Sequence, residues 1–536
     1  MKYKLLSIFT IFLPMLTFAQ DKGLDEKVND AFMPVAVWWE GFVLTSIPIA
    51  GYNLPIVLML LIIGATFFTV YFKFPNITKF GLAINTVRGK YDELDHHSVE
   101  KAELNIVDGD LVDTIGDESK EGEVSHFQAL ATAVSGTVGL GNIAGVAVAI
   151  ALGGPGATFW MIVCGLIGMS TKFVECTLGV KYRDVGADGT VYGGPMYYLS
   201  RGLKQQGFSG LGKVLGIVFA ILCVGASFGG GNAFQSNQAA VQLTTMLNLQ
   251  GGATGVIIGV ILAFLVGIVI IGGIKKIASV TEKIVPFMAV IYVLASLVII
   301  FANIKYIGEA FAMIFNGAFT PMAGLGGILG VIIVGFQRAA FSNEAGAGSA
   351  AIAHSAVKTK YPASEGVVAL LEPFIDTVVI CTMTALVIIF FNMDAGAFEY
   401  GNAVNSTVLI TETGNYVGGV DLTSMAYDSV IPGFRYILTI AIILFAFSTM
   451  ISWSYYGLQS WKFLFGRGKY ADVVYKVLFL LFVVIGAGAT LDAVIKFSDA
   501  MILALVFPNM IGLLFLFPRV KEELNKYIMD IKGIRK

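Results

Sequence analysis

Two glycine-rich segments within apolar runs carry the residue types that could do chemistry in this chain. The first covers residues 135–145 and reads SGTVGLGNIAG, and the second covers residues 335–349 and reads GFQRAAFSNEAGAGS. Glycine lowers the cost of non-helical backbone and lets a ligand approach it closely. Hydroxyl and amide side chains can bond the peptide groups that such a break frees. The start of a half-helix suits a carboxylate, and carbonyls at the opposite end of one suit sodium. The two segments therefore predict a site for an anionic group and a cation.

The composition places these segments in a membrane protein. The chain has 536 residues, of which 56% are hydrophobic and 13% are charged, whereas about a quarter of a soluble domain is charged. The net charge of -2 gives no indication of nucleic-acid binding. The four cysteines lie in apolar runs and are interpreted as packing residues, not as a disulfide set or a metal cluster: Cys164, Cys176, Cys223 and Cys381.

The first residues resemble a secretory signal. A short basic start precedes an apolar run at residues 5–16, and a small residue, Ala19, follows. This pattern predicts a signal peptide at 1–19, cleaved after Ala19, in a protein of the bacterial envelope with its mature N-terminus outside. An uncleaved N-terminal anchor is the alternative.

Hydropathy predicts the elements that must position the two segments. A hydrocarbon core of about 30 Å needs roughly 20 apolar residues in a helix. About eleven candidate spans follow the signal, and they lie near 54–72, 127–150, 155–179, 212–244, 252–272, 284–302, 325–352, 366–392, 432–463, 471–488 and 496–517.

Loop charge orients these spans. With the N-terminus outside, Lys and Arg fall mainly in the loops on the inner side and in the tail at 519–536, whereas the outer loop 393–430 contains neither. This bias predicts an inner-membrane protein with a cytoplasmic C-terminus. The acidic stretch 91–125, the last part of an N-terminal unit at 20–125, is interpreted as a solvated cytoplasmic insert.

The order of the spans suggests an internal repeat. Without the span at 54–72, the rest divide into a first group at 126–302 and a second at 303–518. Each group has five spans, so the second is inverted relative to the first. The two glycine-rich segments open the two groups, and matched interruptions of this kind indicate a transporter binding site. For one segment alone, close helix packing would explain the glycines equally well.

Several motifs resemble the alanine or glycine:cation symporter family over roughly residues 50–520. They lie at 126–130, 138–147, 153–161, 192–198, 231–237, 341–349, 376–377, 381–382, 447–449 and 453–457. Ile162 departs from the family pattern, in which a second Trp usually follows Phe-Trp-Met. The resemblance implies an all-α, leucine-transporter-like fold, a 5+5 inverted repeat preceded by one extra helix, and sodium-coupled uptake of alanine or glycine by alternating access.

The resemblance also implies roles for individual residues. The substrate carboxylate should meet the backbone around Gly136 and Thr137, and Trp453 should wall the pocket. The complete set expected to bind substrate is Gly136, Thr137, Gly139, Gly141, Asn142, Gln235, Asn237, Ser342, Asn343 and Trp453. Sodium, the coupling ion, should lie between Ser135 and the hydroxyls of Ser448 and Thr449. Thr449 and Trp453 are four apart and share one helix face. For Gln235 and Asn237, interhelical hydrogen bonding is an equally good interpretation, and for Trp453 the alternative is an interfacial aromatic anchor.

Charged residues inside predicted spans are functional candidates by default. Glu344 and Asp376 are expected to act in gating or as structural charges, and the others are Glu175, Arg338, Glu372 and Asp492. None of the histidines pairs at metal-ligand spacing, and no hydrolase signature is present, so the sequence does not indicate an enzyme or a cofactor. Expected partners are the amino acid, sodium and the lipid bilayer, with the chain as a monomer. A transporter of the same fold with a different amine or amino acid as substrate, or with proton coupling, remains the main alternative, and a channel or an intramembrane enzyme is the third class.

Overall fold

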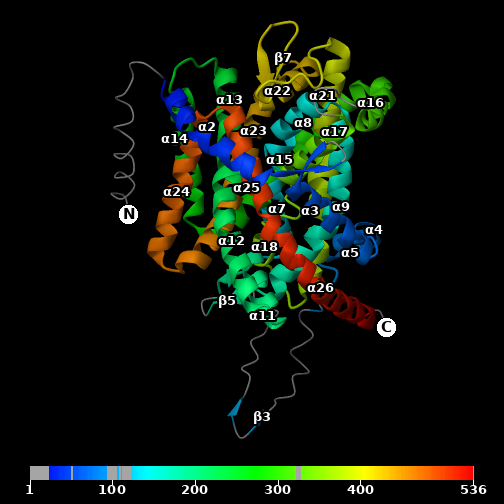
Figure 1. The fold of residues 1–536 in the computed structure, drawn as a ribbon, viewed down its shortest axis with the longest axis vertical. Coiled ribbons are helices and arrows are strands. Elements are labelled where there is room, and N and C mark those ends of the chain that lie inside the picture. Colours follow the sequence, from blue (N-terminus) through cyan, green and yellow to red (C-terminus); the bar gives the residue numbers. More distant parts are fainter. Residues whose placement is uncertain are drawn as a thin grey trace.

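The computed structural model describes residues 23–49, 52–92, 94, 106–107, 110–111, 122–186, 189–320 and 327–534. The predicted signal peptide at 1–19 and most of the acidic stretch at 91–125 lie outside the described residues. The remainder is built from helices that run between two ends of the molecule (Figure 1). The upper end carries α22 and the β7–β8 hairpin, and the lower end carries α11 and the β5–β6 hairpin.

Among the residues that the structure describes, seven helices are long and apolar enough to cross a membrane. They are α9 (Gly156–Lys181), the continuous Ser209–Leu247, α15 (Gly273–Ala302), the continuous Pro362–Ala395, α23 (Phe434–Phe465), α24 (Lys469–Gly488) and the continuous Leu491–Gly533. A bent pair, His126–Thr137 and Gly141–Gly153, forms an eighth if it is one span. Three shorter apolar helices are α3 (Ile56–Tyr71), α14 (Thr254–Ile270) and α17 (Ile328–Asn343). The expectation of an all-helical membrane fold is therefore confirmed, and each predicted span overlaps one of these helices.

Three of the long helices contain π-helical turns, where the regular ladder is locally widened. The first continuous helix consists of α12 (Ser209–Phe228), η5 (Gly229–Ala233) and α13 (Phe234–Leu247). The second consists of α19 (Pro362–Ala369), α20 (Leu371–Pro373), η8 (Phe374–Cys381) and α21 (Thr382–Ala395). The bent pair consists of α7 (His126–Thr137), η3 (Gly141–Gly145) and α8 (Val146–Gly153). The last long helix divides into α25 (Leu491–Ala504) and α26 (Val506–Ile534).

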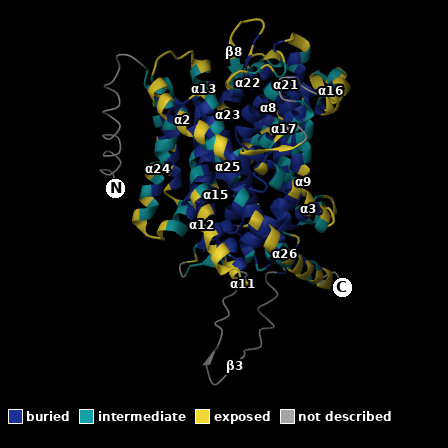
Figure 2. Cartoon of the chain, in the orientation of Figure 1, coloured by how far each residue is buried: buried dark blue, intermediate teal, exposed yellow. Residues whose placement is uncertain are grey.

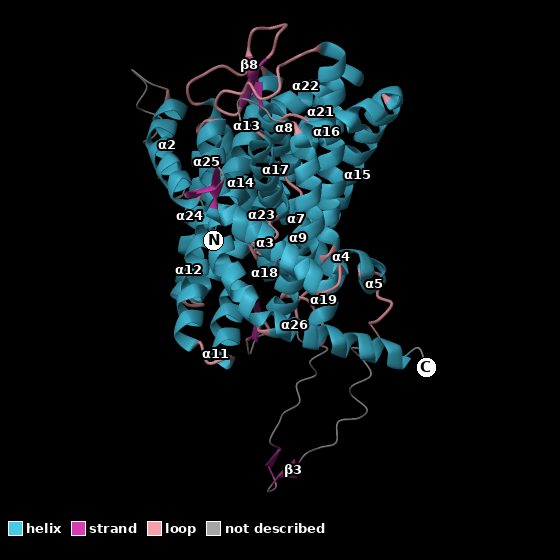
Figure 3. Cartoon of the chain, turned by 45° about the vertical axis from the view of Figure 1, so that its right-hand side comes forward, coloured by secondary structure: helices cyan, strands magenta, loops and turns pink. Residues whose placement is uncertain are grey.

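Short elements lie mainly at the two ends (Figure 3). The hairpins are antiparallel: β1 (Ser46–Ile49) with β2 (Tyr52–Pro55), β3 (Ile106–Val107) with β4 (Asp110–Leu111), β5 (Asp184–Val185) with β6 (Val191–Tyr192), and β7 (Thr407–Leu409) with β8 (Tyr416–Gly418). The short helices are α4 (Pro75–Thr78), α5 (Phe80–Val87), α10 (Pro195–Tyr197), η4 (Tyr198–Gly202), α11 (Leu203–Gln205), η6 (Ile304–Tyr306), α16 (Ile307–Phe319), α18 (Ala351–His354) and α22 (Gly419–Val430).

Helix α2 (Leu24–Val43), of 20 residues, lies outside the spans expected from the sequence and packs along α25. Four acidic residues and Pro34 interrupt its apolar residues, so it lacks a long apolar run. Its outward side exposes Trp38 and Phe42. Such amphipathic aromatics suit a membrane interface.

The burial pattern agrees with a membrane setting (Figure 2). Figure 2 shows buried residues at the centre, and these include polar as well as apolar side chains. Helices α14 and α15 direct a stripe of large apolar residues outward. Exposed members of this stripe are Ile257, Ile261, Phe264, Ile268, Phe287, Leu294 and Val298. In a bilayer such an apolar surface contacts the lipid chains, and the polar residues lie inside the protein.

The two broken helices run in opposite directions beside each other. The chain rises from α7 to α8, which lies near the upper end, and descends from α17 to α18 (Figure 1). Helix α17 packs against both η3 and α8. The two glycine-rich segments therefore meet in the interior.

Candidate functional site

The first break begins where a well-capped helix loses its backbone ladder. Ser125 and Gln128 form a reciprocal capping box that starts α7. The helix ends at Thr137, and the chain resumes as η3 with a bend of 49° across the pair. Side-chain amides satisfy two freed N–H groups, because Gly139 N–H donates to Asn142 Oδ1 at 2.9 Å and Leu140 N–H donates to Gln235 Oε1 at 3.0 Å. Gln235 therefore lies at the first break.

Glycines bring other groups unusually close to this break. A Cβ on Gly139 would lie 2.4 Å from Thr449 Oγ1, and one on Gly136 would lie 2.9 Å from Tyr456 Oη. A Cβ on Gly141 would lie 3.4 Å from the ring of Phe341, just before the second break. The Thr137 hydroxyl bonds back to Ala133 O at 3.2 Å. Gly136 and Gly139 therefore have a steric reason to lack a side chain.

The second break follows α17 directly. Glu344 adopts a left-handed conformation with φ of 55°, and turns lead to α18. Asn343 Oδ1 accepts from Ala345 N–H at 3.0 Å, so this amide also satisfies freed backbone. Glu175 of α9 accepts from Gly346 N–H at 2.9 Å. Both breaks therefore depend on side chains from their own segment and from a neighbouring helix.

Asp376 in η8 joins the two breaks. Its carboxylate accepts from Asn142 Nδ2 at 2.6 Å and from the Ser342 hydroxyl at 2.8 Å, while Thr377 donates at 2.6 Å. Thr377 also accepts from Asn343 Nδ2 at 2.9 Å. All of these residues are buried. The three donors to Asp376 are neutral, so the carboxylate lies in a polar network between the breaks.

Trp453 of α23 lies between the second break and η5. Its indole Nε1–H donates to Glu344 Oε1 at 2.9 Å, and Ser349 donates to the other oxygen of that carboxylate. A Cβ on Gly231 would lie 2.1 Å from Trp453 Cγ, so the ring rests on bare backbone. Trp453 is 1% exposed. This burial contradicts an interfacial anchor, the alternative that the sequence left open.

An oxygen cluster lies where α7 meets α23. Ser135 donates to Ser448 O at 2.9 Å, Thr449 donates to Ser135 O at 2.9 Å, and Ser452 donates to Ser135 Oγ at 3.0 Å. The Ser448 hydroxyl bonds within its own helix, to Phe445 O at 3.0 Å. Hydroxyl and carbonyl oxygens are the donor type that hard cations prefer. The residues expected to hold sodium are thus brought together, with Ser452 as a member that the sequence reading omitted.

Asn237 takes a different position from Gln235, two residues earlier on α13. Its amide donates to Gly486 O at 3.1 Å and to Ala489 O at 2.6 Å, both at the end of α24. These bonds hold one helix end against another, which favours interhelical hydrogen bonding for Asn237.

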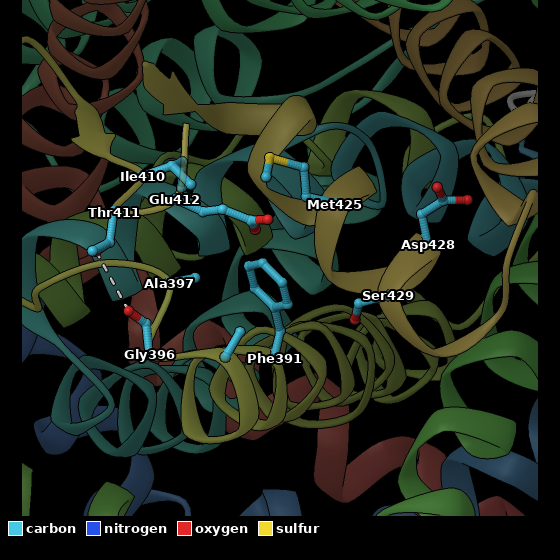
Figure 4. A pocket seen from close by; sticks show the side chains of 10 residues that line it. Phe391, Gly396, Ala397, Ile410, Thr411, Glu412, Met425, Asp428 and Ser429 are labelled. Atoms are coloured by element: carbon cyan, nitrogen blue, oxygen red, sulfur yellow. Dashed lines mark hydrogen bonds between the residues drawn. The ribbon is translucent and has the colours of Figure 1, made fainter. Parts of the chain in front are cut away.

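A pocket at the upper end is separate from the breaks (Figure 4). It has a volume of about 490 Å³ and is lined by Phe391, Ala395, Gly396, Ala397, Ile410, Thr411, Glu412, Met425, Asp428 and Ser429. Helix α22 lies between the two regions, because its Thr423 donates to Ile143 O in η3 at 3.1 Å while its Met425 and Asp428 line the pocket.

Several buried charges were missed from the sequence. Lys172 of α9 donates to Glu372 at 3.0 Å, and both side chains are fully buried. Glu365 bonds the rings of His126 and His354. A lysine in the middle of the predicted span 155–179 was the available signal. Among the charges that were predicted, Arg338 pairs with Asp499, and Asp492 pairs with Lys496 at 2.5 Å.

Comparisons with known proteins identify a family and several relatives. The model of the sodium:alanine symporter family matches residues 43–535. The sodium/alanine symporter AgcS of Methanococcus maripaludis is 43% identical, over 77% of this chain and 86% of that protein. The "Probable sodium/glutamine symporter GlnT" of Bacillus subtilis is 34% identical, over 76% and 80%.

Among solved structures, MhsT in complex with L-phenylalanine is similar with a TM-score of 0.45 and 15% identity, over 75% of this chain and 99% of that one. The family model spans nearly the whole chain, and the relatives named above are transporters. The chain is therefore a multi-pass membrane transporter that belongs to the sodium:alanine symporter family.

Proposed function

We propose that the chain imports alanine or glycine into the cell together with sodium, by alternating access around a site between the two broken helices. The main support for this proposal is that the Asp376 carboxylate accepts hydrogen bonds from both breaks. Asn142 of the first break and Ser342 of the second are the donors. Half-helix ends that converge there can bind a carboxylate at one side and a cation at the other.

The proposed substrate site consists of the first break, the second break and the wall formed by Trp453. Its members are Gly136, Thr137, Gly139, Gly141, Asn142, Gln235, Ser342, Asn343 and Trp453. The contacts of Asn237 with the end of α24 support a packing role for that residue instead. Glu344 would hold the ring of Trp453 in place, and Asp376 would couple the breaks.

The proposed sodium site is the oxygen cluster of Ser135, Ser448, Thr449 and Ser452. It joins α7, which carries the first break, to α23, which carries Trp453. Sodium bound there would stabilise α7 against α23 and thereby shape the substrate site. This arrangement supports coupling, because an ion can drive transport only by favouring one arrangement of the helices over another.

Close packing favours a small substrate. The ring of Trp453 already rests on Gly231, and Gly139 already lies against Thr449. A larger amino acid such as glutamine, the substrate named for one relative, would need this ring to move.

The proposed architecture has eleven spans and two inverted groups of five. The first group would be the α7–α8 pair, α9, α12–α13, α14 and α15, and the second α17–α18, α19–α21, α23, α24 and α25–α26. The opposite directions of the two broken helices support the inversion (Figure 1). We further propose a monomer in the bacterial inner membrane, with a cleaved signal peptide, the upper end outside and the lower end in the cytoplasm.

Uptake into proteoliposomes tests the transport function. Labelled alanine and glycine should accumulate when sodium is high outside, and collapse of the sodium gradient should abolish accumulation. Glutamine should compete weakly. Alanine uptake that ignores sodium would refute the proposal, and preferential uptake of glutamine would refute its substrate.

A further inference from the structure

A chain of buried charged groups links five helices at the lower end. Glu365 of α19 binds the Nδ1 atoms of two histidines, His126 at the start of α7 and His354 at the end of α18. Glu372 of α20 accepts from Lys172 of α9 at 3.0 Å. The side chains of Glu365, His354, Glu372 and Lys172 are all fully buried. Charged groups are retained in such a place only when they are paired.

His354 lies between two carboxylates. Its Nδ1 is 2.5 Å from Glu365 Oε1, and its Nε2 is 3.5 Å from Glu372 Oε2. A neutral imidazole has only one N–H and could donate to only one of them, whereas an imidazolium donates from both nitrogens. With an imidazolium at His354, its charge and that of Lys172 balance those of Glu365 and Glu372. A neutral His354 would remove one of the positive charges that face Glu365 and Glu372.

Other ionisable groups surround this cluster. Glu175 and Cys176 of α9 and Glu344 after α17 act electrostatically on Lys172, and Tyr456 of α23 acts on Glu372. Arg183, beyond the end of α9, donates to three carbonyls that follow His354, those of Ser355, Val357 and Thr359. The guanidinium thus holds the backbone after α18, while His354 faces the two carboxylates.

The same cluster closes the lower end of α7. The backbone before α7 pairs with the backbone after α18, because Lys358 N–H donates to Val124 O at 2.9 Å and Glu123 N–H donates to Ala356 O at 2.8 Å. His126 and His354 extend this pairing through their shared carboxylate, Glu365. Any path from the breaks to the lower end along α7 must separate these groups.

We propose that His354 is a proton-binding site whose proton holds the lower end closed and passes to water on the cytoplasmic side when that end opens. The proposal rests on the proposed function, because it takes opening of the lower end to be the step that releases the amino acid. On opening, Glu365 and Glu372 separate from the ring, one N–H bond of the imidazolium breaks, and a water molecule accepts the proton.

The surroundings of His354 give this step its pH dependence. While the lower end is closed, Glu365 and Glu372 favour the imidazolium form of His354. An exposed histidine has a pKa of about 6.5 and loses its proton above that pH. Above about pH 6.5 the closed end therefore binds more protons than the open end. Opening is therefore favoured as pH rises, by up to about tenfold per pH unit.

Hydrogen exchange of the full chain in lipid nanodiscs tests this inference. Peptides covering 351–361 report on opening of the lower end, and peptides covering α22 serve as a reference at the upper end. After correction for the intrinsic rise of exchange with pH, protection of 351–361 should fall by up to about tenfold from pH 7 to pH 8 in the wild type. His354→Gln should remove this response. His126→Gln makes the same substitution but leaves His354 between its carboxylates, so it should keep the response.

Three results would overturn the inference. The first is protection of 351–361 that does not depend on pH in the wild type, a result that needs no variant. The second is an unchanged pH response of this protection in His354→Gln, and the third is its loss in His126→Gln. Sodium-dependent binding of alanine is measured on the same preparation. Its absence would refute the proposed function, whereas intact alanine binding with pH-independent exchange would refute only the role of His354.

Discussion

The hydroxyl of Thr449 links the proposed sodium site to the first break. It donates to Ser135 O, and Gly139 lies directly against it. Thr449→Ala should raise the sodium concentration for half-maximal alanine uptake by about fivefold, since a buried hydrogen bond contributes about 1 kcal/mol. Thr449→Ser keeps the hydroxyl and should restore most of the sodium affinity. Equal sodium dependence in Thr449→Ala and the wild type would contradict this assignment.

Gly231 must lack a side chain because the ring of Trp453 packs directly against its backbone. An added Cβ would lie 2.1 Å from Trp453 Cγ, so Gly231→Ala should displace the ring and cost about 1–3 kcal/mol of stability through overpacking. Alanine affinity should fall more than sodium affinity, as measured by equilibrium binding. Gly210→Ala in α12 is the matched control, because no described atom lies within 4 Å of the Cβ it would add. Unchanged alanine affinity in Gly231→Ala would exclude Trp453 from the substrate site.

Two of the amide side chains on helix α13 make different contacts. Gln235 holds the first break through Leu140 N–H, whereas Asn237 holds the end of α24. Gln235→Ala should weaken alanine binding at least about fivefold, since an unsatisfied buried N–H costs about 1–3 kcal/mol. Asn237→Ala should lower the melting temperature by a similar energy and leave alanine affinity near wild type. A loss of alanine affinity in Asn237→Ala equal to that in Gln235→Ala would return Asn237 to the substrate site.

The elements differ in how far the sequence predicts them. Hydropathy located helices such as α24 within a few residues, because a long apolar run in a membrane has few other solutions. It did not find α2, whose charges and Pro34 hide its apolar side. Glycine and amide content located both breaks, but it did not show that Asp376 joins them. That contact depends on how three helices pack, and the same holds for Lys172 and Glu372, which lie 200 positions apart.

The whole molecule combines two broken helices of opposite direction with a surface suited to lipid. The buried residues at the centre (Figure 2) include many polar side chains, whereas large apolar residues of α14 and α15 are exposed. The breaks are thus enclosed in protein, the condition under which irregular backbone is tolerated at membrane depth. Access to the breaks must come from movement of whole helices at one end or the other. The orientation of the two ends in the membrane therefore determines the direction of transport.

Cysteine labelling tests that orientation. All four native cysteines are buried and unpaired, so background labelling should be low. Thr413 lies in the loop between β7 and β8 at the upper end, and Lys204 lies in α11 at the lower end, and both are exposed. In sealed right-side-out vesicles, a membrane-impermeant maleimide should label Thr413→Cys, whereas Lys204→Cys should react only after permeabilisation. The basic residues that gather toward the lower end, such as Arg201 and Arg467, support this direction through the positive-inside rule. Labelling of Lys204→Cys in sealed vesicles, with Thr413→Cys protected, would invert the molecule and with it the direction of the proposed proton release at His354.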